Sequence, residues 1–185
     1  MSTTPRIFVG WALSPAIGAW IDCTQGLEEA QAAVEAIRSN PNKPADAVEL
    51  CIPESQGFHG LVRSLGVHRL AFICELAEAL DSNAINGEVL AAFCEAQGHH
   101  STIASGAVSD LWDLDKMLNE AYVGTWESGA DFAEERWKEL NPELAAQIPD
   151  EILESVDWSK VWAGWETSGY TSADVSDGVA IFNAR

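Results

Sequence analysis

The hydrophobic pattern changes its period along this sequence, which indicates a chain of several small units. Two segments rich in β-branched and aromatic residues, RIFVGWAL (6–13) and GAWIDC (18–23), flank the turn-like SPAI and predict two antiparallel strands. Apolar residues at helical spacing follow over 27–39 and end at NPNKP, and AVELCIPES (47–55) predicts a third strand. We therefore expect a β-β-α-β unit over residues 1–66.

Helical spacing without strand signals begins at Val67. VHRLAFICELAEAL (67–80) and GEVLAAFCEAQ (87–97) predict two helices, and a further short helix is expected near STIAS (101–105). Residues 67–104 are therefore expected to form a small helical bundle.

The remaining section, 105–185, mixes both patterns. SDLWDLDKMLNEA predicts a helix capped by Ser109, and AYVGTW predicts a strand. Ser128 and Asp131 have capping-box spacing and predict the start of a helix that Asn141-Pro142 ends. Two short helices are expected in IPDEILESV and DWSKVWAGWE, followed by a hairpin of YTSADV and GVAIFN around SDG.

The expected fold class is α+β, with small domains at 1–66, 67–104 and 105–185, and the charge is unevenly divided among them. The chain has 29 Asp and Glu against 10 Lys and Arg, a net charge of −19, of which the three domains carry −3, −4 and −12. Such an anionic chain is repelled by nucleic acid and by anionic membranes, so its expected partners are basic proteins. The alternative is that the negative charge simply keeps the chain soluble.

The helix expected after Ser128 combines an apolar stripe with an acidic surface. The stripe consists of Phe132, Ala133, Trp137 and Leu140, and Trp137 is one of eight tryptophans that we expect mainly as core anchors. The acidic surface consists of Asp131, Glu134, Glu135 and Glu139, with Arg136 and Lys138 nearby. Asp131, Glu135 and Glu139 form a row of i,i+4 neighbours. Like charges one turn apart repel by a few tenths of a kcal/mol per pair, so helix stability alone does not favour this row. Its spacing of about 5 to 6 Å is on the scale of phosphates along a DNA strand.

Other candidate sites have incomplete motifs. Four cysteines, Cys23, Cys51, Cys74 and Cys94, are isolated among apolar neighbours and are expected as buried free thiols. The carboxylates of DLWDLD (110–115) lack the spacing of a calcium loop, and His99-His100 with Cys94 lacks a fourth zinc ligand. Because the sequence has no nucleophile elbow, phosphate loop or metalloprotease motif, we expect no catalytic residue, no metal and no cofactor. It also has no export signal and no run of 18 apolar residues, which predicts a cytoplasmic protein without membrane contact.

Several segments together resemble the ArdA antirestriction proteins. The strongest is Ala121-Tyr122-x-Gly124, followed by Trp126-x-Ser128 and Asp131-Phe132-Ala133-Glu134-Glu135. RIFVGWAL, GAWID, IPDEILESVDW and DGVAIFN agree in their order along the chain. The resemblance spans nearly the whole sequence and is strongest at 121–135 and 148–183.

The resemblance implies an elongated homodimer of three-domain chains that imitates bent B-form DNA. Such a protein binds no nucleic acid itself but occupies the DNA-binding groove of type I restriction-modification enzymes, on their methyltransferase and specificity subunits. At net −38 the dimer would hold the charge of roughly 65 Å of duplex, or about 19 base pairs. The expected phosphate-mimicking residues are Glu127, Asp131, Glu134, Glu135 and Glu139, with Asp110, Asp113 and Asp115 added on charge alone.

Two alternative functions stay open from the sequence. The chain could be an acidic interaction module that inhibits a different DNA-binding defence effector. It could also be an acidic hydrolase, which would need one carboxylate with a strongly raised pKa.

Overall fold

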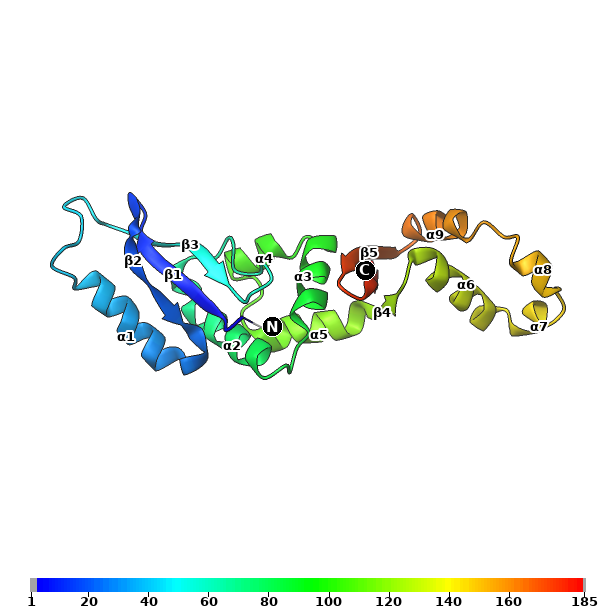
Figure 1. Ribbon diagram of the computed structural model, residues 1–185, viewed down its shortest axis with the longest axis horizontal. Coiled ribbons are helices and arrows are strands. Elements are labelled where there is room, and N and C mark those ends of the chain that lie inside the picture. The colour runs from blue at the N-terminus through cyan, green and yellow to red at the C-terminus, as the bar shows by residue number, and fades with distance from the viewer. Residues whose placement is uncertain (1–2, 185) are drawn as a thin grey trace. The chain divides into compact units, whose positions relative to one another are not determined.

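The computed structural model describes residues 3–184 and divides into two compact units, Met1–Leu118 and Asn119–Arg185 (Figure 1). Each unit contains a three-stranded antiparallel sheet together with helices, which confirms the α+β fold class. The division between the units falls near the end of helix α5 (Leu111–Ala121). The finer boundaries expected near residues 66 and 104 stay predictions.

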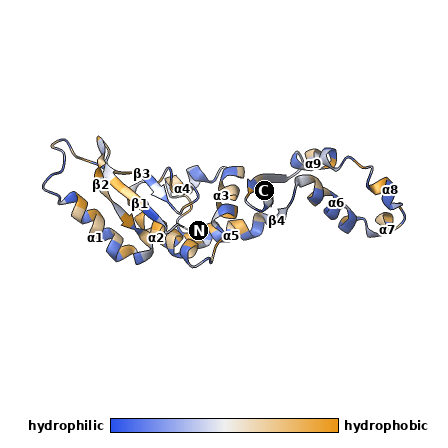
Figure 2. Ribbon diagram, in the orientation of Figure 1, coloured by the Kyte–Doolittle hydropathy of each residue, from blue (hydrophilic) through white to orange (hydrophobic). Residues whose placement is uncertain are grey.

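The first unit begins with a sheet in which β1 is the central strand. The strands are ordered β2-β1-β3 and have the bounds Arg6–Trp11 (β1), Ser14–Asp22 (β2) and Leu50–Gln56 (β3). β1 buries Ile7 and Val9 completely, and Figure 2 shows it as a mainly hydrophobic strand. Helix α1 (Leu27–Arg38) packs on this sheet through its buried apolar stripe, as its 3.6-residue period predicted.

The connection between the first two strands differs from the expected SPAI turn. Ser14 pairs with Trp11, so the chain turns at Ala12 and Leu13, and the SPAI residues form the start of β2. A proline in a strand normally argues against β structure because it donates no ladder hydrogen bond. Pro15 is tolerated here because β2 is an edge strand. Turn composition therefore pointed to the wrong residues.

The remaining elements of the first unit are helical. They are η1 (Cys23–Gln25), η2 (Val67–Arg69), α2 (Leu70–Asp81), α3 (Gly87–Ala96), α4 (His100–Ser105) and α5. The stripe of α2 that helical spacing predicted, which includes Ile73 and Ala77, is buried. α2 contacts both η1 and α1, so these helices share one unit with the sheet.

Arg69 joins the start of α2 to the segment that precedes α5. Its Nη2 donates to the backbone carbonyl of Val108 at 2.7 Å, and its Nη1 donates to the carbonyl of Ser109 at 3.4 Å. Its guanidinium also lies over the Phe72 ring, 4.8 Å from the centroid. A single cation therefore binds two carbonyls that have no helical partner.

The second unit consists of a sheet whose first two strands in the sequence are connected by a series of helices. Strand β4 (Tyr122–Trp126) leads into α6 (Gly129–Leu140), and β5 (Tyr170–Val175) and β6 (Gly178–Asn183) form the expected closing hairpin. The strand order is β4-β6-β5, so the last strand of the sequence is central. Three further helices lie between α6 and β5: α7 (Pro142–Ala145), α8 (Asp150–Leu153) and α9 (Trp158–Glu166). In Figure 1, α9 returns alongside α6 to the sheet, in agreement with their contacts.

Phe132 is the centre of the second unit's core. It is 1% exposed, and its ring centroid lies 4.6 Å from that of Trp126 and 5.7 Å from that of Trp162. Trp165 and Tyr170 also pack against it. These edge-to-face contacts join α6 and α9 to each other and to β4 and β5.

One expectation about an apolar residue was wrong, whereas the tryptophans are placed largely as expected. Leu140 was placed on the packed stripe, but 58% of its surface is exposed. Trp137 packs against Trp158 at the first residue of α9, and Leu140 lies about one turn beyond that contact. Of the eight tryptophans expected mainly as core anchors, Trp11 is buried, Trp20 and Trp112 are exposed, and the other five are half-buried. Three of the half-buried ones, Trp126, Trp162 and Trp165, pack around Phe132 as anchors of the core.

Candidate partner-binding surface

Negative charge is concentrated in the second unit. Residues 119–185 include 14 Asp and Glu and 4 Lys and Arg, a net charge of −10, whereas the 118 residues before them have a net charge of −9. The second unit therefore has about twice the charge density of the first. Five of the eight expected site residues lie in this unit, on α6 or just before it.

The start of α6 is fixed by the predicted Ser128 cap. The Ser128 hydroxyl oxygen accepts a hydrogen bond from the Asp131 backbone N–H at 3.2 Å, and the hydroxyl donates to the Asp131 carboxylate at 2.6 Å. The Asp131 side chain is exposed in the first turn, where the helix dipole favours a negative charge. Asp131 therefore stabilises the start of α6 and also presents its charge to solvent.

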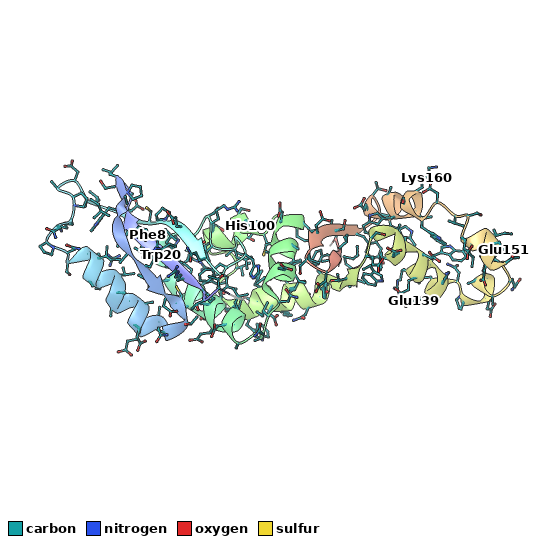
Figure 3. The ribbon with its side chains drawn as sticks, in the orientation of Figure 1. Phe8, Trp20, His100, Glu139, Glu151 and Lys160 are labelled. Atoms are coloured by element: carbon teal, nitrogen blue, oxygen red, sulfur yellow. The ribbon has the colours of Figure 1, made fainter. Side chains whose placement is uncertain are left out.

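Two of the expected site residues are neutralised by cations of the same helix. Lys138 Nζ lies 2.5 Å from the Glu134 carboxylate, and Arg136 Nη1 lies 2.9 Å from the Glu139 carboxylate. The Glu139 hydrogen bond, followed by one to Tyr170, raises the pKa of Arg136. Figure 3 shows Glu139 extending from α6 and Lys160 from α9. Lys160 in turn lies 2.9 Å from Asp157 and lowers the pKa of that carboxyl through its hydrogen bonds.

Glu127 and Glu135 have no ion pair in the part of the chain that the structure describes. Both are exposed. Trp126 Nε1 donates to the Glu135 carboxylate at 2.6 Å, which positions this acid without removing its charge. Together with Asp131, these residues form the unpaired acidic group at the start of α6.

The three aspartates of α5 belong to the other unit. Asp110 accepts the Asp113 backbone N–H at 2.9 Å, so Asp110 and not Ser109 caps the helix. The Ser109 hydroxyl donates instead to the Asp110 and Asp113 carboxylates at 3.3 and 3.4 Å. Asp110, Asp113 and Asp115 are all half-buried. They are therefore less exposed than Glu127, Asp131 and Glu135.

Sequence reasoning missed four exposed acids beyond α6: Glu143, Asp150, Glu151 and Glu154. Residues 141–156 contain these four acids and no Lys or Arg, which was the signal available in the sequence. No ion pair among residues 3–184 involves them. Figure 3 shows Glu151 on α8, at the end of the second unit remote from its sheet. Exposed acids without an ion pair among the described residues therefore lie on and near α7 and α8 as well as at the start of α6.

The cysteines and His99, which the sequence offered as other candidate sites, lie among packed apolar residues or remain half-buried. Cys23, Cys74 and Cys94 are buried free thiols, Cys51 is half-buried and also free, and burial raises the pKa of Cys94 to about 12. The His99 ring packs on Phe93 with centroids 4.9 Å apart. Across residues 3–184, no three His, Cys, Asp or Glu side chains gather in a way that could hold a metal ion. No helix of that range combines the length and the apolar character that a membrane span needs.

These features define an acidic α+β protein with unneutralised carboxylates on its second unit. The family model for the antirestriction protein ArdA matches residues 15–179, about nine tenths of the chain. The chain therefore belongs to the ArdA antirestriction protein family, an inhibitor family whose members interact with restriction enzymes. No match was found among curated proteins or among solved structures.

Proposed function

We propose that this protein is a DNA mimic that inhibits type I restriction-modification enzymes. It would act as a cytoplasmic homodimer and occupy the groove in which the methyltransferase and specificity subunits hold DNA. Lys and Arg of that groove would meet carboxylates in place of phosphates, so binding would compete with DNA and weaken as salt rises.

The observation that carries the proposal is the unneutralised charge of the second unit. Every Lys and Arg that the structure describes there, namely Arg136, Lys138 and Lys160, is paired with an acid of its own helix or cap. Among the residues that the structure describes, these pairs leave the remaining carboxylates of the unit with no cation to neutralise them. A surface of this kind favours a basic partner and disfavours an acidic one.

The magnitudes show that α6 alone is insufficient for mimicry. A 12-residue helix is about 18 Å long, and duplex DNA of that length carries about 11 charges, whereas α6 has a net charge of −2. The whole second unit, at −10, holds the charge of about 17 Å of duplex, or about five base pairs. The proposal therefore requires the acids of α7, α8 and the loops as well as those of α6.

Three double variants test the proposal because they change charge in different directions. Glu127→Gln with Glu135→Gln removes two unpaired carboxylates, and the glutamine at 135 still offers an oxygen to Trp126. Glu134→Gln with Lys138→Gln removes one ion pair at constant net charge. Arg136→Gln with Lys138→Gln makes the net charge more negative by two.

The measurements are inhibition of DNA cleavage by a purified type I enzyme and displacement of labelled duplex from it. Two charges near cations of the groove contribute about 1 kcal/mol each in water, so losing Glu127 and Glu135 should weaken inhibition by about 30-fold. The charge-neutral pair variant should stay within about twofold of wild type, because exposed ion pairs contribute little. The variant lacking both cations should inhibit at least as well as wild type. Full inhibition by the first variant, or an equal loss in the charge-neutral one, would contradict the proposal.

A further inference from the structure

The first unit contains a cavity of about 510 Å³ that is lined by the end of α1, the long loop that leads to β3 and the segment before α2. Figure 1 shows the course of these three segments in the first unit. Its volume lies within the usual range of small-molecule sites. The lining residues are Trp11, Arg38, Lys43, Ala47, Val48, Glu49, Leu50, Gly66, Val67 and His68.

The cavity gathers basic groups in a chain that has few of them. Arg38, Lys43 and His68 line it, and Glu49 is the only carboxylate among the lining residues. The whole chain has 29 acids against 10 Lys and Arg, so cations outnumber carboxylates among the lining residues but not in the chain as a whole, and Glu35 pairs with Arg38 beside the cavity. Distant carboxylates act weakly here because charges are screened over about 8 Å at physiological salt.

The rest of the lining is apolar. Of these lining residues, Trp11 and Leu50 are buried, whereas Val48 is 91% exposed. Apolar walls with a few convergent polar groups are typical of sites for small organic molecules. The apolar part of a bound ligand could therefore cover Val48 while the charged group of the same ligand contacted Arg38 and Lys43.

Backbone and ring contacts position these walls. Ala12 N–H donates to the Glu49 carbonyl at 2.9 Å, which attaches the end of the loop to the turn after β1. Lys43 N–H donates to the Asn40 carbonyl at 3.1 Å within the same loop. The His68 ring lies against Gly66, where an added Cβ would be 2.7 Å from Nδ1.

Arg38 is accessible to a ligand. Its guanidinium lies 2.5 Å from the Glu35 carboxylate, but its side chain is 53% exposed. Exposed ion pairs of this kind are weak and exchange readily with other anions. Arg38 can therefore offer its other N–H groups to a phosphate, to which guanidinium is geometrically matched.

We propose that this cavity binds a small phosphate monoester whose organic part is apolar. The phosphate lies between Arg38, Lys43 and His68, and the organic part lies against Trp11, Val48 and Val67. This site is separate from the acidic surface of the second unit, so it is independent of the proposed antirestriction function.

The test is calorimetric titration of the full chain with 1-naphthyl phosphate, 1-naphthol and inorganic phosphate. The ester should bind at least about tenfold more tightly than either fragment, because only the ester uses both the cations and the apolar wall. Amide shifts in ¹⁵N NMR spectra on adding the ester should centre on residues 43–50 and 66–68. Equal affinity for ester and fragments, or shifts centred elsewhere, would overturn the proposal.

A charge-matched pair of variants completes the test. Arg38→Gln with Lys43→Gln should weaken ester binding by about tenfold or more. Arg63→Gln with Lys116→Gln removes two other exposed cations of the same unit that do not line the cavity, and should leave binding unchanged. An equal loss in both double variants would show a general charge effect and reject the site.

Discussion

Adding one methyl group to Gly129 should destabilise the second unit, although the same change elsewhere in this unit should stabilise it. Gly129 is the first residue of α6, and an ideal Cβ there would lie 2.5 Å from Trp162 Cε2 and 2.6 Å from Cδ1. Trp162 cannot move freely, because its ring packs edge-to-face on Phe132. Gly164 on α9 offers the matched control, since an added Cβ there would meet no atom within 4 Å.

The two substitutions should have opposite signs. An alanine in place of a helical glycine gains up to about 1 kcal/mol from backbone entropy. At Gly164 nothing opposes this gain, so Gly164→Ala should raise the free energy of unfolding by about 0.5 to 1 kcal/mol. At Gly129 the overlap of about 1 Å with the indole ring requires repacking, which costs about 1 to 3 kcal/mol. Gly129→Ala should therefore lower the free energy of unfolding by about 1 kcal/mol after the two effects offset each other.

Urea denaturation followed by tryptophan fluorescence measures this difference. Five of the eight tryptophans lie in the second unit, so the signal reports mainly on that unit. Gly129→Ala should shift the midpoint to lower urea, and Gly164→Ala should shift it to higher urea. Equal midpoints for the two variants would refute the packing of α6 on Trp162.

Three further changes test other features of the fold. Arg69→Met keeps an apolar stem but removes the donors to the Val108 carbonyl, so it should lower the free energy of unfolding by about 1.5 kcal/mol. It should also speed amide exchange near the start of α5, and unchanged exchange would contradict this role of Arg69. Hydrogen bonds, chiefly from the Thr24 hydroxyl, lower the pKa of Asp22, so this carboxylate stabilises the fold above about pH 4 and that contribution is lost as pH falls through its folded pKa. The Asp22→Asn variant should thus lose less stability than wild type on acidification at constant ionic strength. If the urea midpoints of the two proteins fall by the same amount as pH is lowered, this role of Asp22 is contradicted. Ser128→Ala should lower the free energy of unfolding by about 1 kcal/mol through loss of the helix cap, seen as a lower urea midpoint, and an unchanged midpoint would show that the cap is dispensable.

Periodicity and capping signals predicted most elements of this fold. The stripe of α1, the start of α6 at Ser128 and the closing hairpin were all readable from local spacing, because each depends on residues within a few positions of one another. The turn after β1 was not readable in this way. Its position depends on β2 being an edge strand that tolerates Pro15, which is a property of the sheet and not of the local sequence.

The candidate surface was predicted less completely than the fold. Counting charges located the acidic region, but it treated Glu134 and Glu139 as equivalent to Glu135. Which acid a lysine or arginine neutralises depends on side-chain rotamers and on neighbouring rings, such as Trp126 beside Glu135. The exposure of Leu140 likewise depends on where α9 begins, which no spacing within α6 could indicate.

The central position of β6 determines when the second unit can fold during synthesis. β4 and β5 do not pair with each other, since each pairs only with β6. When a ribosome has translated as far as residue 177, the nascent chain contains the residues of α6 through α9 but lacks the strand that joins its sheet. The first unit is complete by residue 118 and can fold earlier. A chain that ends before residue 178 would therefore have a folded first unit followed by an acidic, aromatic-rich segment that cannot form its sheet and is open to chaperones and proteases once it is released.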